Sequence, residues 1–252
     1  MIPSTTGSTA LVTGGGSGIG RAVAVLLASR GARVAVLDLD ETGAAQTVDR
    51  IVRDGGDAVA VACDLADPAR IDAALTAVSA WGGPVRAACL NAGIGSLGTV
   101  ETLLLDEWRR TLAVNLEANL HLLRGLLAPM REAGGGSIVA VSSLSAVRAD
   151  HPESSPAYGI SKAALERLVL DVARRSADDG IRANAVRPGP VDTGFVANRL
   201  PGPDPGPRAV VGARRADPRD VAAVIAFLLS DEARLITGQI ITADAGFSLT
   251  GR

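Results

Sequence analysis

Thr9-Ala10-Leu11-Val12-Thr13-Gly14-Gly15-Gly16-Ser17-Gly18-Ile19-Gly20 is the segment of this 252-residue chain that decides its fold class. Its first five residues suit a buried strand, the glycine-rich part suits a turn, and residues 21–30 continue in a helical pattern. In a unit of this kind, backbone N–H groups at the start of the helix can bind a phosphate. A plain tight turn has a similar composition, so the nucleotide interpretation needs support from the rest of the chain.

The rest of the chain repeats the alternation of strand and helix. We expect strands at residues 33–37, 58–63, 85–90, 137–141, 181–186 and 239–242, and helices at 41–54, 68–80, 106–130, 217–229 and from 156 onward. This alternation predicts the α/β class and a single Rossmann-like, doubly wound parallel sheet of about seven strands, with helices on both faces. Residues 194–212 are rich in proline and glycine, which favours a loop or lid over a substrate. No repeat or linker divides residues 1–252, so we expect one domain.

Asp38 follows the second expected strand and stands eighteen residues after Gly20 (38 − 20). An acid at this place accepts a hydrogen bond from a ribose 2′-hydroxyl and repels a 2′-phosphate. Leu39 follows it, and the glycine turn contains no arginine or lysine. These residues predict NAD rather than NADP. The alternative is that Asp38 caps the helix that begins near Glu41.

Small and polar residues follow the other expected strands. Asp64-Leu65, Asn91-Ala92-Gly93, Ser142-Ser143 and the run from Arg187 to Thr193 each stand directly after a strand. Ligands of doubly wound sheets bind at the carboxyl ends of the strands. We therefore expect these residues to share one site.

Tyr158 and Lys162 are the only tyrosine and the only lysine of the chain, and they stand four residues apart. Ser155 is a good N-cap and Pro156 suits the first helical position, so Tyr158 falls in the first turn of a helix. Lys162 then lies on the same face, and both its ammonium and the positive end of the helix dipole favour a phenolate. Lowering a tyrosine pKa from about 10 toward neutrality takes roughly 3 to 4 kcal/mol, which requires both effects. The alternative is a packed tyrosine beside a solvated lysine.

Two helical faces carry further expectations. Residues 106–130 read as one helix with leucines at positions 112, 116, 120, 123 and 127, and Asn115 interrupts this pattern. Asparagine is unfavourable inside a helix, so a specific role is expected. On the Tyr158 helix, the spacing of Leu165, Leu168, Val169 and Val172 suits either the core or a partner helix.

Composition excludes several classes of protein. A formal charge of −2 argues against nucleic acid as a partner, and no apolar run is long enough to cross a membrane. The N-terminus lacks a signal-peptide pattern, which predicts a cytoplasmic protein. Cys63 and Cys89 lie in apolar stretches without a CxxC spacing, so we expect buried free thiols and no metal site.

Taken together, these motifs resemble the short-chain dehydrogenases/reductases. The resemblance runs from the Thr13-to-Gly20 turn through the strand-end residues and the Tyr158–Lys162 pair to Ile236-Thr237-Gly238-Gln239 and Asp244. Each motif is modest alone, but their order and spacing are specific. Asp244-Ala245-Gly246 departs from the Asp-Gly-Gly that is frequent in the family, but the lost glycine puts little of the resemblance in doubt.

The resemblance implies a catalytic group of Asn115, Ser143, Tyr158 and Lys162. Tyr158 would be the general base or acid, Lys162 would lower its pKa and hold the nicotinamide ribose, Ser143 would bind the substrate oxygen, and Asn115 would hold a water linking Lys162 to solvent. The implied cofactor-binding positions are Gly14, Ser17, Gly18, Ile19, Gly20, Asp38, Leu39, Asp64, Leu65, Asn91, Ala92, Gly93, Tyr158, Lys162, Pro188, Gly189, Val191 and Thr193.

The position of the serine departs from the family's common spacing. Thirteen residues usually separate it from the tyrosine, which here selects Ser145 (158 − 13). Ser143 is preferred because it ends the strand and because residues 149–153 suggest a loop lengthened by two residues. Arg148 and His151 in this region are candidates for contact with substrate, although a solvated loop is the simpler interpretation.

The resemblance implies an NAD-dependent oxidoreductase that interconverts a secondary alcohol and a ketone. Residues 194–211 carry Phe195, Val196, Leu200, Val210 and Val211, with Arg199 and Arg208, which favours a largely apolar substrate. A 3-oxoacyl thioester reductase of the same family is an alternative, and a non-catalytic NAD-sensing scaffold is another. The family also implies a homo-oligomer, either a tetramer or a dimer.

Overall fold

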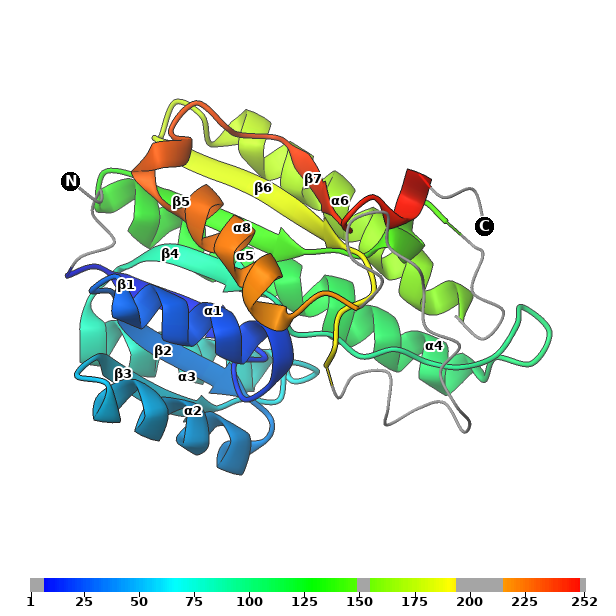
Figure 1. Cartoon of the computed structure of the whole chain (residues 1–252), viewed down its shortest axis with the longest axis horizontal. Coiled ribbons are helices and arrows are strands. Elements are labelled where there is room, and N and C mark those ends of the chain that lie inside the picture. The colour runs from blue at the N-terminus through cyan, green and yellow to red at the C-terminus, as the bar shows by residue number, and fades with distance from the viewer. Residues whose placement is uncertain (1–6, 149–154, 194–214, 250–252) are drawn as a thin grey trace.

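The computed structural model describes residues 7–148, 155–193 and 215–249. Within them, one parallel sheet has the strand order β3-β2-β1-β4-β5-β6-β7 (Figure 1). The strands are β1 (Thr9–Thr13), β2 (Arg33–Asp38), β3 (Asp57–Ala62), β4 (Val85–Leu90), β5 (Gly136–Val141), β6 (Ile181–Pro188) and β7 (Ile240–Ala243). The predicted fold class is confirmed.

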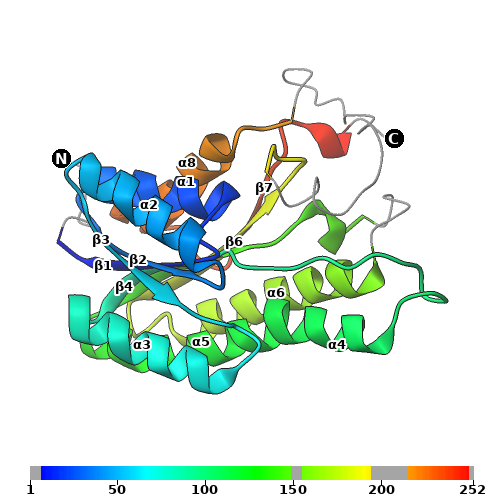
Figure 2. The same cartoon turned by 90° about the horizontal axis from the view of Figure 1, so that it is seen from below.

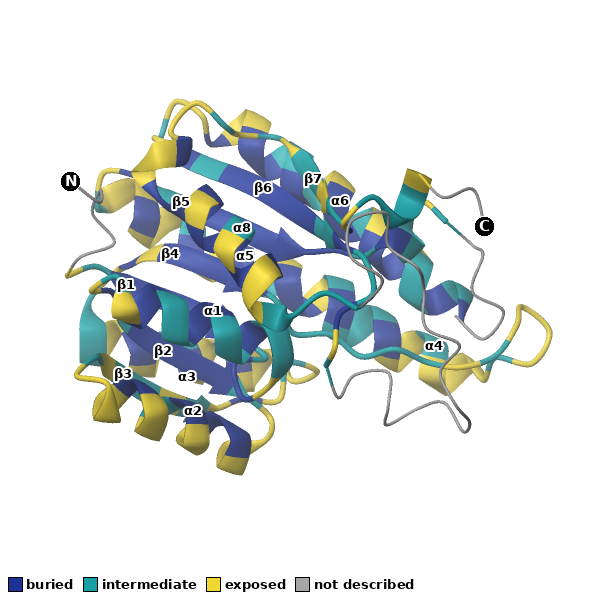
Figure 3. Cartoon of the chain, viewed as in Figure 1, coloured by how far each residue is buried: buried dark blue, intermediate teal, exposed yellow. Residues whose placement is uncertain are grey.

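Helices cover both faces of this sheet, as Figure 2 shows. On one face lie α1 (Gly18–Ser29), α2 (Glu41–Arg53) and α8 (Pro218–Leu229). On the other lie α3 (Pro68–Gly82), α4 (Leu105–Leu112), α5 (Ala118–Glu132) and α6 (Pro156–Arg175). Each face has its own apolar core, and the central strands are buried on both sides (Figure 3). Near-continuous apolar strands are typical of a parallel sheet between two helical layers.

The strand order reverses next to β1, and this reversal positions the site. The chain moves outward through β2 and β3, then returns to place β4 on the other side of β1. The loops after β1 and β4 therefore diverge at the carboxyl edge of the sheet. This is the place where doubly wound folds bind their ligands.

The long helix predicted at residues 106–130 contains an interruption. A π-helical segment, Ala113–Glu117, separates α4 from α5 and includes Asn115. The extra residue in this turn rotates the face of α5 relative to that of α4, so Leu120 is 47% exposed, whereas Leu122, Leu123 and Leu126 are buried. Of the predicted leucines beyond the π segment, Leu123 is buried and Leu127 packs against the core, whereas Leu120 departs from the buried face.

The structure also tests the predicted start of α1, the predicted face of α6 and the predicted burial of the cysteines. Helix α1 begins at Gly18, earlier than predicted, because the glycine turn itself enters the helix. On α6, Leu165, Val169 and Val172 are buried in the core of their own chain, so the partner-helix alternative for them was wrong. Cys63 and Cys89 are buried free thiols, as predicted.

Several predictions fall outside the described residues. These are the lid at residues 194–212 with its apolar and arginine residues, the loop at 149–153, and His151. No helix in the described ranges has the length and apolarity needed to cross a membrane.

Candidate active site

The glycine turn packs too closely to accept side chains at two positions. A Cβ on Gly20 would lie 2.1 Å from the Gly14 carbonyl oxygen, and one on Gly14 would lie 2.9 Å from the Ala92 Cα. Gly14 also has a φ of 64°. Ser17 is the N-cap of α1, but its side chain makes no capping hydrogen bond. The positive helix end is therefore left open toward a ligand, which fits the diphosphate of a dinucleotide.

Thr13 and Asn91 tie the ends of β1 and β4 together. The Thr13 Oγ1 accepts hydrogen bonds from the backbone N–H groups of Asn91 and Ala92, each at 3.0 Å. The Asn91 Nδ2 donates to the Thr13 carbonyl at 3.0 Å and to the Gly14 carbonyl at 3.2 Å. These contacts hold the glycine turn against the strand reversal.

Asp38 is bound to the glycine turn. Its Oδ2 accepts from the Gly16 N–H at 2.8 Å, and its Oδ1 accepts from the Asp40 N–H at 2.9 Å. The N-cap of α2 is Asp40, so the alternative in which Asp38 caps that helix was wrong. A half-buried carboxylate beside the turn fits the ribose of a dinucleotide.

The remaining expected cofactor positions follow the other strands at this edge. Asp64 is exposed, and its Oδ1 accepts from the Ala66 N–H at 2.9 Å. Thr193 packs beside the turn, since a Cβ on Gly18 would lie 3.1 Å from its Cγ2. Leu39 is 63% exposed, Leu65 packs against one core, and Val191 bridges to Ala216. Pro188 ends β6, and Gly189 lies against Asp244.

Tyr158 and Lys162 lie at the start of α6, as predicted. The Ser155 side chain accepts from the Ala157 N–H, and Pro156 is the first helical residue. The Lys162 Nζ lies 5.8 Å from the centroid of the Tyr158 ring and donates to the Val141 carbonyl at 2.8 Å. Lys162 is 3% exposed, and this burial lowers its pKa to about 8. The solvated-lysine alternative was therefore wrong.

Asn115 connects the π segment to the loop after β4. Its Oδ1 accepts from the Ile94 N–H at 2.8 Å, and its Nδ2 donates to the Ile94 carbonyl at 2.8 Å and the Ser161 Oγ at 3.0 Å. A Cβ on Gly93 would lie 3.2 Å from the Lys162 Nζ and 3.3 Å from the Asn115 Oδ1. The glycine thus leaves room where these two polar atoms converge.

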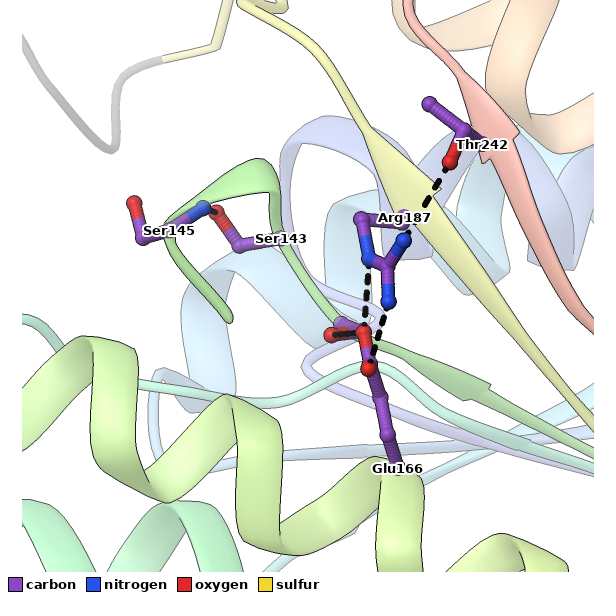
Figure 4. Close-up of polar contacts among 6 residues, drawn as sticks. Ser143, Ser145, Glu166, Arg187 and Thr242 are labelled. Carbon is purple, nitrogen blue, oxygen red and sulfur yellow. Dashed lines mark hydrogen bonds and ion pairs between the residues drawn. The ribbon is translucent and has the colours of Figure 1, made fainter. Parts of the chain in front are cut away.

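Ser143 caps the short 3-10 helix Leu144–Ala146, and its Oγ accepts from the Ser145 N–H at 3.1 Å (Figure 4). A Cβ on Gly159 would lie 2.7 Å from the Ser145 carbonyl, so this turn sits against the first turn of α6. Arg148 lies 5.5 Å from the centroid of the Phe247 ring and donates to the Ser248 carbonyl at 3.4 Å. It therefore joins this loop to the C-terminal segment.

A buried ion pair next to these residues was not predicted from the sequence. Glu166 on α6 and Arg187 on β6 join at 2.7 Å, with side chains 8% and 16% exposed respectively. The sequence does contain a signal for this ion pair, because Glu166 stands one turn after Lys162 on the same helix face. Its partner comes from a strand 21 residues later, so only the tertiary structure reveals it.

The structure thus joins one group of the expected residues in a continuous arrangement at the carboxyl edge of the sheet. Contacts run from Asp38 through the glycine turn and Asn91 to Gly93, and from there to Lys162, Asn115 and Tyr158. No group of three His, Cys, Asp or Glu side chains within the described ranges could hold a metal ion.

Comparison with known proteins identifies the family. Residues 14–248 match the family described as Enoyl-(Acyl carrier protein) reductase. The structure of a putative short-chain dehydrogenase/reductase from Burkholderia xenovorans superimposes with a TM-score of 0.92 at 32% identity, over 98% of each chain. This chain belongs to the short-chain dehydrogenase/reductase family. The prediction of the family is confirmed, and with it membership among oxidoreductases that use a nicotinamide cofactor.

Other members similar to this short-chain dehydrogenase/reductase act on different alcohols. The D-threitol dehydrogenase of Mycolicibacterium smegmatis is 35% identical, over 96% of this chain and 94% of the relative. The cyclohexanol dehydrogenase of an Acinetobacter species is 35% identical, over 95% and 94%. A putative NAD(P)-dependent gluconate 5-dehydrogenase from Beutenbergia cavernae, solved with bound NADP, has a TM-score of 0.89 at 33% identity, covering 97% of this chain and 98% of that chain.

Proposed function

We propose that this protein is an NAD(H)-dependent oxidoreductase that interconverts a secondary alcohol and a ketone. The observation that carries the proposal is the fully buried Lys162 beside Tyr158 at the N-terminus of α6. A buried ammonium and a helix N-terminus both stabilise a phenolate, which is the form of tyrosine that accepts a proton.

Tyr158, Ser143 and Asn115 each have a separate role in the proposed reaction. Tyr158 takes the hydroxyl proton during oxidation and returns it during reduction. Ser143 donates a hydrogen bond to the substrate oxygen and stabilises charge that develops there. Asn115 holds the Ile94 loop and faces the Lys162 ammonium across Gly93. A bound nicotinamide would supply the hydride chemistry at the substrate carbon, and the part of the protein is to align the two.

The cofactor side of the proposal rests on Asp38. Its carboxylate is fixed to the glycine turn by the Gly16 N–H, where it would accept a hydrogen bond from the adenosine ribose of a bound cofactor. A second negative charge at that place would be repelled, so NAD is favoured over NADP. The glycine turn, Asn91 and Thr193 hold the rest of the dinucleotide.

The substrate class is supported by two observations. The apolar side chains of residues 194–211 include Phe195, Leu200 and Val210, and a relative similar over nearly the whole chain is a cyclohexanol dehydrogenase. An alicyclic or other largely apolar alcohol is therefore preferred to a polyol such as D-threitol. Reduction of a 3-oxoacyl thioester is the second candidate, because a similar solved structure, at 33% identity and a TM-score of 0.88, is a 3-ketoacyl-ACP reductase from Sinorhizobium meliloti.

The test is to measure NADH and NADPH binding by fluorescence, then to screen alcohols, ketones and a 3-oxoacyl thioester by absorbance of the reduced cofactor. We expect selective NADH binding and turnover of apolar secondary alcohols. The Tyr158→Phe variant should keep NADH binding and lose turnover by about 10³-fold or more, as expected for loss of a general acid–base. NADH binding without turnover across the panel would instead favour the NAD-sensing scaffold.

A further inference from the structure

The Glu166 carboxylate is buried and accepts hydrogen bonds through both of its oxygens. Its Oε1 accepts from the Arg187 Nε at 2.9 Å and from the Ser142 Oγ at 2.6 Å, and its Oε2 accepts from the Arg187 Nη2 at 2.7 Å. The Arg187 Nη1 also donates to the Thr242 Oγ1 at 3.5 Å. Figure 4 shows Arg187 extending from β6 between Glu166 on α6 and Thr242 on β7.

Lys162 and Glu166 lie one helical turn apart on α6, and both side chains are buried. They reach consecutive residues at the end of β5, because the Lys162 Nζ donates to the Val141 carbonyl and Glu166 accepts from Ser142. Opposite charges at this helical spacing normally attract each other. Yet no ion pair joins Lys162 and Glu166 among the described side chains, because Arg187 and Ser142 engage the carboxylate.

We propose that Arg187 is a positioning residue for the active site: by binding Glu166 in a two-point ion pair, it prevents that carboxylate from capturing the Lys162 ammonium. Lys162 is thereby kept on the Val141 carbonyl and beside Tyr158. The inference rests on the proposed function in that it assumes Tyr158 and Lys162 act as a catalytic pair.

The groups shown to contact or face Lys162 within the described ranges are uncharged. Val141 of β5 presents a carbonyl, the π segment presents the Asn115 amide, and the loop after β4 presents Gly93. On α6 itself, the Tyr158 ring lies on one side of Lys162, and Glu166 is one turn away on the other. From β6 the charged group is Arg187. On α6, Glu166 is therefore the carboxylate that stands one turn from Lys162, and Arg187 is its ion-pair partner.

The composition of the chain makes a direct test available. Because Lys162 and Tyr158 are the only lysine and tyrosine, protein labelled with [13C]lysine and [13C]tyrosine gives one side-chain NMR signal for each titrating group. In the Arg187→Met variant, we expect the pKa of Lys162 to rise by about one unit, a tenfold gain in proton affinity. The pKa of Tyr158 should rise as well, because its neighbouring ammonium turns toward Glu166.

The double variant Arg187→Met with Glu166→Gln should restore both titrations, because the carboxylate that captures Lys162 is gone. The kcat for alcohol oxidation near neutral pH should fall about tenfold in the single variant and return to within about threefold of the wild type in the double variant. Arg187→Gln, which keeps hydrogen-bonding capacity without the charge, provides a second route should the methionine variant fold poorly.

Arg182→Met is the matched control. Arg182 lies on the same strand, and its guanidinium donates to the carbonyls of Leu228, Ser230 and Ile236. Its loss should lower stability and leave both titrations unchanged. The proposal is wrong if neither Arg187 variant changes the pKa values of Lys162 and Tyr158. It is also wrong if adding Glu166→Gln does not reverse the change. Shifted titrations without turnover of any substrate would leave the inference standing and contradict the proposed function.

Discussion

Asp38 is the residue whose substitution most directly tests the cofactor. In the Asp38→Ala variant, the repulsion of a 2′-phosphate and the hydrogen bond to a ribose hydroxyl are both lost. We expect the ratio of NADH to NADPH affinity to fall by about tenfold or more, which corresponds to roughly 1.4 kcal/mol. Fluorescence titration with both reduced cofactors measures this ratio. Asp40→Ala, an exposed carboxylate two residues away, should leave it unchanged, and an unchanged ratio in Asp38→Ala would contradict the role of Asp38.

Lys162 gives the protein a defined dependence of stability on pH. Burial lowers its pKa from 10.5 to about 8. Below pH 8 the folded and unfolded chains both hold the proton, so the unfavourable burial of the ammonium is fully expressed. Between pH 8 and pH 10.5, Lys162 has lost its proton in the folded chain but keeps it in the unfolded chain. The free energy of unfolding therefore rises by about 1.4 kcal/mol per pH unit over this range.

The Lys162→Met variant lacks this contribution. The difference in unfolding free energy, wild type minus variant, should therefore increase as pH rises from 8 toward 10. Urea denaturation of both proteins at several pH values measures it, and the two cysteines contribute equally to both proteins and cancel. A difference that stays constant over this range would mean that the lysine is not buried as an ammonium.

At the scale of elements, the π segment depends on Asn115. Its side chain is fully buried and satisfies both the N–H and the carbonyl of Ile94. In Asn115→Ala these two backbone groups lose their partners, which should destabilise the protein by about 2 to 4 kcal/mol and lower turnover. Urea denaturation and steady-state kinetics measure the two effects. Thr76→Ala, which removes one exposed hydrogen bond on α3, is the control and should change neither.

The helix α6 joins the chemistry to the core. Its first turn carries Tyr158, its middle carries Lys162 and Glu166, and Leu165 and Val169 anchor it against the sheet. The position of the proposed catalytic pair, Tyr158 and Lys162, is therefore set by the core that holds the helix. This is the arrangement that a preorganised site requires.

At the scale of the whole molecule, the reactivity of the two cysteine thiols can report on the opening of different parts of the sheet. Cys89 lies in the central strand β4, with its pKa raised by burial to about 12, and Cys63 follows the edge strand β3, with its pKa raised by burial to about 11. Central strands open only with global unfolding, whereas edges open locally. We expect iodoacetamide at pH 8 to alkylate Cys63 faster than Cys89, as measured by mass spectrometry of peptides. Equal rates would indicate that the sheet opens as one unit.

Much of this architecture was predictable because its signals are local. The alternation of strands and helices, the glycine turn, and Ser155-Pro156 at the start of α6 each depend on neighbouring residues, and the structure has them where expected. The position of Asp38 was predictable for a related reason, since parallel strands end at a common edge. The π turn on the long helix escaped prediction, because its Asn115 pairs with Ile94, 21 residues earlier, a contact that no local pattern shows.

By itself, the sequence determined the fold class, the edge of the sheet at which the site forms, and the spacing that puts Tyr158 and Lys162 on one helix face. Only the tertiary structure decided which charges neutralise one another. Lys162 is buried against Val141, and Glu166 pairs with Arg187 rather than with the lysine one turn away. Local periodicity specifies the face of a helix, but the electrostatic environment of a buried charge depends on strands that meet it from distant parts of the chain.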